Sequence, residues 1–153
     1  MNLIAILDYG MGNLRSVAQA MKTAAPEADV RITHEPEVVR AAERIILPGQ
    51  GAMPDCMREL EASGLKQAVL DAAKTKPFLG ICVGAQLLFE FSEEGNTPGL
   101  GVFKGKVIRF PAEKMFDEHG QKLKVPHMGW NEMFIVKSHQ IGRASCRERV
   151  SSP

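Results

Sequence analysis

Residues 3–25 read LIAILDYGMGNLRSVAQAMKTAA, and the fold class follows from this pattern. The continuous apolar run at 3–7 is typical of a strand that is buried on both faces of a sheet. Gly10 and Gly12 form a turn, and apolar residues then recur at helical spacing up to position 25, where Pro26 ends the pattern. The chain therefore begins with a strand, a turn and a helix.

The same alternation continues along the chain. Further strands are predicted at 29–33, 44–47 and 77–81, and further helices at 36–42, 60–74 and 84–91, with a Gly/Pro loop before the helix at 60. Strands separated by helices predict a parallel sheet that is covered on both faces. Residues 101–110 and 131–136 alternate apolar with polar around a turn at 118–120, which indicates antiparallel strands at a sheet edge or in a small excursion. The predicted fold class is α/β, a doubly wound and mostly parallel sheet with an antiparallel extension.

Composition excludes several classes of protein. The 153 residues are 44% apolar and 24% charged, with a formal net charge of +1, which suits one globular domain and argues against a nucleic-acid platform. Cys56, Cys82 and Cys146 form no CxxC pair, so we expect no disulfide framework, no metal and no cofactor. No apolar run approaches about 18 residues, and we expect a cytoplasmic protein.

The sharpest motif is G-I-C-V-G at residues 80–84, between a predicted strand and a predicted helix. The related G-x-S-x-G pattern forms a nucleophile elbow, a tight turn that presents its central side chain at the carboxyl end of the sheet. Cys82 is therefore a candidate nucleophile, and the N–H of Val83 is a candidate oxyanion donor. The alternative is that Cys82 is a small buried hydrophobe.

Two other glycine-rich turns follow predicted strands. The loop at 48–53 should lie at the same edge of the sheet and offers free N–H groups for an oxyanion hole, although a plain tight connection is an equal alternative. The Gly10-x-Gly12 turn has Arg15 where a dinucleotide fingerprint requires a third glycine, so we discount NAD binding.

A cysteine nucleophile needs a base, which is usually histidine. The chain has four histidines, His34, His119, His127 and His139, and none lies in a context that predicts proximity to Cys82. The sequence around His127 also gathers Met128 and the single tryptophan, Trp130, which suits packing or a partner interface.

Four motifs together carry a resemblance: DYGMGNL at 8–14, LPGQGAM at 47–53, GICVGAQLLF at 80–89 and PHMGWN at 126–131. In this combination the chain closely resembles the glutaminase subunits of imidazole glycerol phosphate synthase, which are class I glutamine amidotransferases of histidine biosynthesis. The resemblance spans residues 3–136. The cysteine motif is common to all class I amidotransferases, whereas the first and last motifs point to this subunit.

The resemblance implies a flavodoxin-like sheet and a thioester mechanism. Cys82 would attack the side-chain amide of glutamine and release ammonia, and Gln86, with Gly84, would hold the substrate. The oxyanion hole would be formed by Val83 and by Gly49, Gln50 and Gly51. Ammonia would pass through a tunnel to a cyclase subunit, a TIM barrel, in a heterodimer. The residues implied at that interface are Asn13, His127, Met128 and Trp130.

The chain also departs from the family pattern. Gln50 stands where the family has Val or a similar residue, and no F-H-P-E-like string supplies the catalytic histidine and glutamate. We expect residues 1–139 to be an incomplete amidotransferase domain, 140–153 to be a non-native or disordered tail, and the fragment to be inactive alone. The alternatives are another class I amidotransferase or cysteine hydrolase domain, or a non-catalytic flavodoxin-like binding module.

Overall fold

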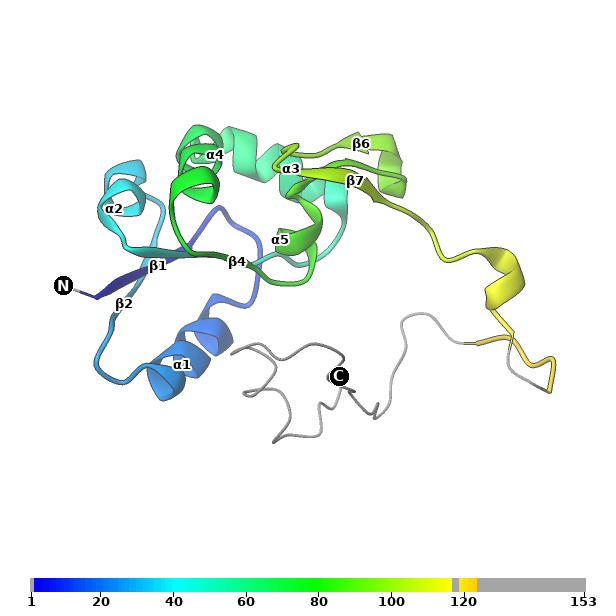
Figure 1. Cartoon of the computed structure of the whole chain (residues 1–153), viewed down its shortest axis with the longest axis horizontal. Helices are drawn as coiled ribbons and strands as arrows, with labels where there is room; N and C mark the ends of the chain where they lie inside the picture. Colours follow the sequence, from blue (N-terminus) through cyan, green and yellow to red (C-terminus); the bar gives the residue numbers. More distant parts are fainter. Residues whose placement is uncertain (1, 117–118, 124–153) are drawn as a thin grey trace. The chain divides into compact units, whose positions relative to one another are not determined.

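The computed structural model describes residues 2–116 and 119–123. The chain divides into two units, and the boundary in the sequence lies between Arg109 and Phe110. The first unit holds a strand and helix series in chain order: β1 (Leu3–Leu7), α1 (Leu14–Ala24), β2 (Asp29–Thr33), α2 (Pro36–Ala41), β3 (Arg44–Leu47), α3 (Met53–Ala62), α4 (Lys66–Thr75), β4 (Phe78–Gly80), α5 (Val83–Gln86), β5 (Phe89–Ser92), η1 (Glu94–Asn96), β6 (Thr97–Pro98) and β7 (Phe103–Val107). Figure 1 shows these elements along the chain.

The main sheet has four parallel strands in the order β2-β1-β3-β4 (Figure 1). This matches the first four positions of the flavodoxin-like order 2-1-3-4-5. Ile46 is paired with Ile6 on one side and with Leu79 on the other, so one apolar row crosses three strands. The predicted α/β class with a parallel sheet is confirmed.

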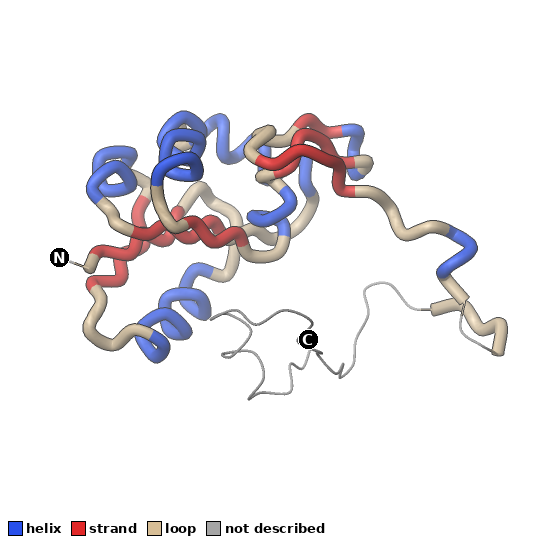
Figure 2. The backbone as a smooth tube through the Cα atoms, viewed as in Figure 1, coloured by secondary structure: helices blue, strands red, loops and turns tan. Residues whose placement is uncertain are grey.

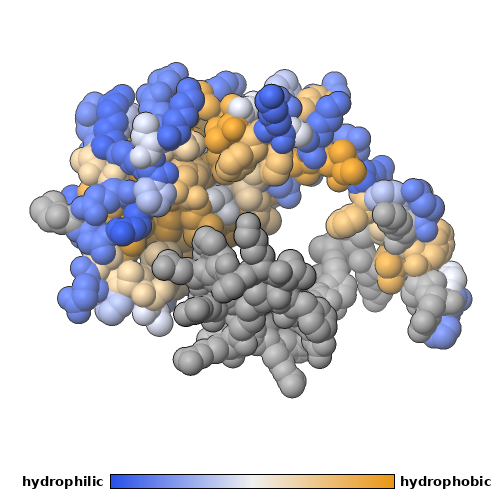
Figure 3. Space-filling model, viewed as in Figure 1, coloured by the Kyte–Doolittle hydropathy of each residue, from blue (hydrophilic) through white to orange (hydrophobic). Residues whose placement is uncertain are grey.

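Helices cover both faces of this sheet because its strands carry apolar side chains on both sides. Leu3, Ala5 and Leu7 of β1 pack with α2, α3 and α4, whereas Ile4 and Ile6 pack with α1. Figure 2 shows α1 on one face of the sheet and α2, α3 and α4 on the opposite face. Each fully buried aliphatic side chain contributes roughly 1.5–3 kcal/mol. In the space-filling view the outer surfaces of α2 and α4 are mostly polar (Figure 3).

One predicted helix is wrong in its bounds. Residues 60–74 were expected as one helix after a loop, but the structure has α3 from Met53 to Ala62 and α4 from Lys66 to Thr75. Pro54 lies in the first turn of α3, where its missing N–H is not needed, so it starts a helix there. Gly64, with φ +74°, ends α3 in the left-handed conformation.

The predicted helix at 84–91 is also wrong. The helix α5 ends at Gln86, and β5 begins at Phe89 in a second, three-stranded sheet with the order β6-β5-β7. Apolar and polar residues alternate in β5, as they do in a half-buried strand. The expected small excursion from the main sheet exists, but only β6 pairs antiparallel with β5, and β7 pairs parallel with it.

The second unit is described over two short stretches. A 3-10 helix, η2, spans Ala112–Lys114, and Phe116 forms an antiparallel bridge with Lys122 across a turn at His119 and Gly120. The strand predicted at 131–136 and the domain boundary predicted at 139/140 lie outside the described residues. Within the described ranges, no helix is long and apolar enough to span a membrane.

Candidate active site

Cys82 occupies a strained turn between β4 and α5. Its backbone angles are φ 54° and ψ −122°, close to the first central position of a type II′ turn, which normally takes glycine. Holding a residue with a Cβ there costs of the order of 1–3 kcal/mol. The side chain is exposed, so the alternative of a buried structural cysteine does not apply. Such a turn presents a thiol to a ligand, as the elbow motif predicts.

The loop at 48–51, the loop between β3 and α3, packs directly against this elbow. A Cβ on Gly84 would lie 1.9 Å from the Leu47 carbonyl oxygen, and one on Gly49 would lie 2.3 Å from the Gly84 nitrogen. The N–H of Ile81 donates to the same Leu47 oxygen at 3.0 Å. Backbone approaches this close leave no room for a side chain. The structure therefore brings together two motifs that lie about thirty residues apart in the sequence.

The elbow leaves backbone donors beside the thiol. Val83 opens α5, and its N–H donates to no acceptor in the part of the chain that the structure describes. Gln50 and Gly51 are exposed on the adjacent loop. Donors fixed beside a nucleophile can stabilise a developing oxyanion. Because α5 spans only residues 83–86, its dipole stabilises a negative charge at its N-terminus less than the dipole of the long helix predicted here would.

The opening turn supports the same loop. Gly12 has φ +116°, and a Cβ there would lie 3.0 Å from Pro48 Cβ. Asn13, which was predicted to face a partner, is exposed and caps α1, since its Oδ1 accepts a hydrogen bond from the Ser16 N–H at 3.2 Å. Packing and capping therefore explain the shape of this turn, and a partner contact stays a prediction.

Two buried side chains that the sequence reasoning missed lie under the loop. Tyr9 Oη donates to the Pro48 carbonyl at 2.7 Å, and Cys56 Sγ donates to the Gln50 carbonyl at 3.3 Å. Burial, together with the neighbouring Cys56, raises the pKa of Tyr9. Burial also raises the pKa of the Cys56 thiol. Both groups are therefore kept as neutral hydrogen-bond donors.

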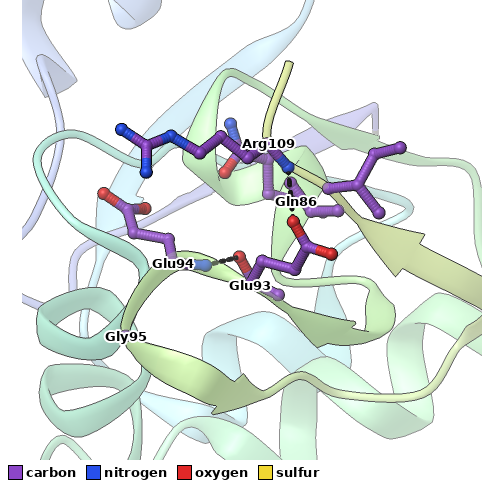
Figure 4. Close-up of a pocket in the computed structure, with 8 residues that line it drawn as sticks. Gln86, Glu93, Glu94, Gly95 and Arg109 are labelled. Carbon is purple, nitrogen blue, oxygen red and sulfur yellow. Dashed lines mark hydrogen bonds between the residues drawn. The ribbon is translucent and has the colours of Figure 1, made fainter. Parts of the chain in front are cut away.

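Gln86, one helical turn after Cys82, lines a cavity of about 680 Å³. Charged groups of both signs border this cavity: Glu93, Glu94 and Arg109 (Figure 4). Glu93 Oε2 accepts from the Arg109 N–H at 2.8 Å, and Glu94 Oε2 accepts from the Met53 N–H at the start of α3 at 2.9 Å. The sequence reasoning missed these three residues because it assigned 84–91 to a helix and so did not place the second sheet beside the elbow.

Among the described residues of the first unit, no histidine lies close to Cys82. His34 follows β2, and three strand spacings, roughly 14 Å, separate β2 from β4. His119 lies in the second unit. His127, Met128, Trp130 and His139 lie outside the described residues. The described part of the chain contains no group of three or more His, Cys, Asp or Glu residues that could hold a metal ion.

Comparison with known proteins identifies the family through a family model and through curated relatives. The family model for class-I glutamine amidotransferases matches residues 5–148. The imidazole glycerol phosphate synthase subunit HisH of Nitrosospira multiformis is 64% identical over 138 residues, which cover 90% of this chain and 65% of that protein. The same subunit of Dechloromonas aromatica is 66% identical over 130 residues, covering 85% and 60%, and that of Aromatoleum aromaticum is 60% identical over 141 residues, covering 92% and 66%.

The chain thus spans slightly less than two thirds of the length of these curated relatives. A crystal structure of a glutamine amidotransferase superposes with a TM-score of 0.58 at 21% identity, covering 69% of this chain and 56% of that one, which supports the fold alone. The strained cysteine turn, the glycine loop against it and the match over residues 5–148 agree, and the chain belongs to the class-I glutamine amidotransferase family.

Proposed function

We propose that this chain is the glutaminase subunit of an imidazole glycerol phosphate synthase in histidine biosynthesis. Such a subunit hydrolyses glutamine to glutamate and ammonia and delivers the ammonia to a cyclase subunit. This chain carries the cysteine of that reaction, and because it contains no F-H-P-E-like string we propose that it is inactive alone. The observation that carries the proposal is Cys82, an exposed thiol held at φ 54° between β4 and α5. The names and high identity of the HisH relatives support the pathway.

In the proposed mechanism, the Cys82 sulfur attacks the side-chain amide carbon of glutamine. The carbonyl oxygen becomes an oxyanion, which accepts hydrogen bonds from Val83 N–H and from the loop of Gly49, Gln50 and Gly51. Collapse of this intermediate breaks the carbon–nitrogen bond, so ammonia leaves and a glutamyl thioester remains. Water then hydrolyses the thioester and frees the thiol.

The cavity beside Gln86 is the proposed seat of the glutamine substrate. Gln86 lies in the last turn of α5, and Gly84 lies between it and Cys82. Glu94 and Arg109 border the same cavity, so carboxylate and guanidinium groups are available for the ammonium and carboxylate of an amino acid (Figure 4). Gln86 links this cavity to the elbow, because it lies one helical turn after Cys82.

We further propose a heterodimer with a TIM-barrel cyclase in the cytoplasm. Asn13 is the proposed interface residue that the structure describes, and it is exposed at the start of α1. His127, Met128 and Trp130 are the other proposed interface residues. The proposal includes no metal or cofactor.

The first test is selective alkylation of the 153-residue chain. A glutamine-like chloroketone, L-2-amino-4-oxo-5-chloropentanoate, should modify Cys82 at least tenfold faster than Cys56 or Cys146, and glutamine should slow the reaction. Peptide mass spectrometry after timed quenching measures each site. Because the sequence contains no F-H-P-E-like string, this assay measures the nucleophile without requiring hydrolytic turnover.

The control is Cys82→Ala, which should remove the fast phase and leave slow labelling elsewhere. Equal labelling of all three cysteines in a folded chain would contradict the proposal. The pathway is tested separately by measuring whether the histidine-pathway cyclase changes the rate of chloroketone labelling at Cys82. A class I amidotransferase of another pathway, or an unrelated cysteine hydrolase, would not respond to that cyclase.

A further inference from the structure

The loop at 48–51 is tied to the core at two of its carbonyl groups. Tyr9, two residues after the end of β1, donates a hydrogen bond to the Pro48 carbonyl at 2.7 Å. Cys56, in the first turns of α3, holds the Gln50 carbonyl at 3.3 Å. Tyr9 is 3% exposed and Cys56 is 0% exposed, and the two side chains also interact with each other. Side chains from two separate parts of the sequence thus bind the carbonyl groups of Pro48 and Gln50 in the same loop.

These bonds fix the direction of the loop's N–H groups. In a trans peptide the C=O and N–H bonds point in opposite directions. Because Pro48 directs its carbonyl to Tyr9, the N–H of Gly49 points away from Tyr9. In the same way, the N–H of Gly51 points away from Cys56.

The loop contacts the elbow through Gly49, whose added Cβ would lie 2.3 Å from the Gly84 nitrogen and 2.8 Å from the Val83 carbonyl carbon. A rotation of either held peptide would therefore change the direction of a donor beside Cys82.

The chemistry of the two side chains suits this role. A hydroxyl or thiol can hold a carbonyl only while it keeps its proton. Burial raises the pKa of Tyr9 and also that of Cys56, so both stay protonated at neutral pH. Neither residue has a role in the thioester chemistry described above.

We propose that Tyr9 and Cys56 are positioning residues, which hold the 48–51 loop in the orientation that directs its N–H groups to the oxyanion on the substrate of Cys82. The inference rests on the proposed glutaminase function. It assigns a role to a second cysteine that the catalytic cycle does not use.

The test compares two alkylating reagents on the same thiol. In the chloroketone reaction the Cys82 sulfur forms a bond to carbon, chloride leaves, and the neighbouring carbonyl oxygen gains negative charge that an oxyanion hole can stabilise. In the iodoacetamide reaction the sulfur displaces iodide, and the reagent does not occupy a glutamine site. The ratio of the two second-order rate constants at Cys82 therefore reports on the oxyanion donors, whereas thiol accessibility affects both constants.

Tyr9→Phe removes one hydroxyl and should lower this ratio about tenfold, since removal of a whole oxyanion donor costs about 10²–10³ in rate. Cys56→Ala should lower it to a similar extent. Cys56→Ser keeps a donor at the same position and should recover much of the loss. A core variant on another helix, Val69→Ala on α4, controls for a general loss of stability and should leave the ratio unchanged.

The outcomes separate the two proposals. If the original chain shows no preference for Cys82, both the proposed function and this inference are wrong. If it shows the preference, and folded Tyr9→Phe and Cys56→Ala keep the original ratio, only this inference is overturned. A fall in the ratio with Val69→Ala equal to that with Tyr9→Phe would also overturn it, because the effect would then be one of general stability.

Discussion

Replacing Cys82 with glycine should make the folded chain more stable, although it removes the proposed nucleophile. The backbone at this position has φ 54° and ψ −122°, which a residue with a Cβ occupies at a cost of about 1–3 kcal/mol. Glycine adopts these angles without that cost. The Cys82 side chain is exposed, so its removal sacrifices little buried surface.

The expected gain follows from two opposing terms. Relief of strain raises the free energy of unfolding by about 1–3 kcal/mol, and the greater freedom of glycine in the unfolded chain lowers it by about 0.5–1 kcal/mol. The net stabilisation is then about 0–2.5 kcal/mol, with a central value of roughly 1 kcal/mol. For a chain of about 150 residues, 1 kcal/mol shifts the melting temperature by about 2–4 °C. The melting temperature should therefore rise by a few degrees.

The matched control is Cys82→Ala, which also removes the sulfur but keeps the Cβ. Urea unfolding of the three proteins at pH 7, with the slope of each transition compared, measures the free energies. At an ordinary position glycine is less stable than alanine by about 0.5–1 kcal/mol, so the predicted sign is reversed here. A Cys82→Gly variant that is equal to or less stable than Cys82→Ala would refute the argument that this turn is strained.

Three further predictions concern packing, capping and pH. Gly84→Ala places a Cβ 1.9 Å from the Leu47 oxygen, so it should lower the free energy of unfolding in urea by about 3 kcal/mol or more. It should also slow chloroketone labelling of Cys82, and unchanged labelling would contradict the packing of the elbow. Lys76→Met removes a donor to three carbonyls at the end of α2 and should lower the free energy of unfolding by about 1–3 kcal/mol. Its control, Lys66→Met, breaks an exposed ion pair and should lower the free energy of unfolding by less than about 1 kcal/mol. Because the pKa of Cys56 is raised above its ordinary value of 9.0 by burial, the unfolded chain loses this proton first, and stability should fall as pH rises above about 9. Unfolding free energies from pH 7 to 10.5 should show a shallower decline in Cys56→Ser, and an identical decline would exclude the thiol as a cause.

The main sheet could be predicted because local sequence patterns identify its strands. β1, β2 and β3 have the predicted bounds, since an apolar or alternating run that is ended by Asp, His or Pro-Gly can be recognised without distant information. The errors lie where a local rule has two outcomes. A proline can end a helix or occupy its first turn, as Pro54 does in α3. The helix α5 stops after one turn, because the chain then enters a sheet whose partners, β6 and β7, are more distant in the sequence.

The candidate site shows the same division. The elbow and the glycine loop could be predicted from spacing, because close backbone contact requires glycine whatever the neighbours are. Tyr9 and Cys56 could not, since their partners are carbonyl groups, which every residue has. Tyr9 and Pro48 are 39 positions apart in the sequence, and the pairing of β1 with β3 brings them together. Glu94, whose carboxylate reaches the start of α3 from 41 residues away, was missed for the same reason.

The strain at Cys82 is held in place by packing on both sides of the turn. The N–H of Ile81 is bound to Leu47, and Gly84 lies against the same carbonyl, so both ends of the turn are fixed to β3. If Cys82 relaxed to an ordinary φ, the chain would leave the turn in a different direction, and at least one of these contacts would be lost. Gly84→Ala and Cys82→Gly therefore perturb the same turn with opposite signs. The first breaks the packing that imposes the strain, and the second keeps the packing and removes the strain. If both variants destabilised the chain, relief of strain at position 82 would not outweigh the greater freedom of glycine in the unfolded chain, and the argument from strain would fail.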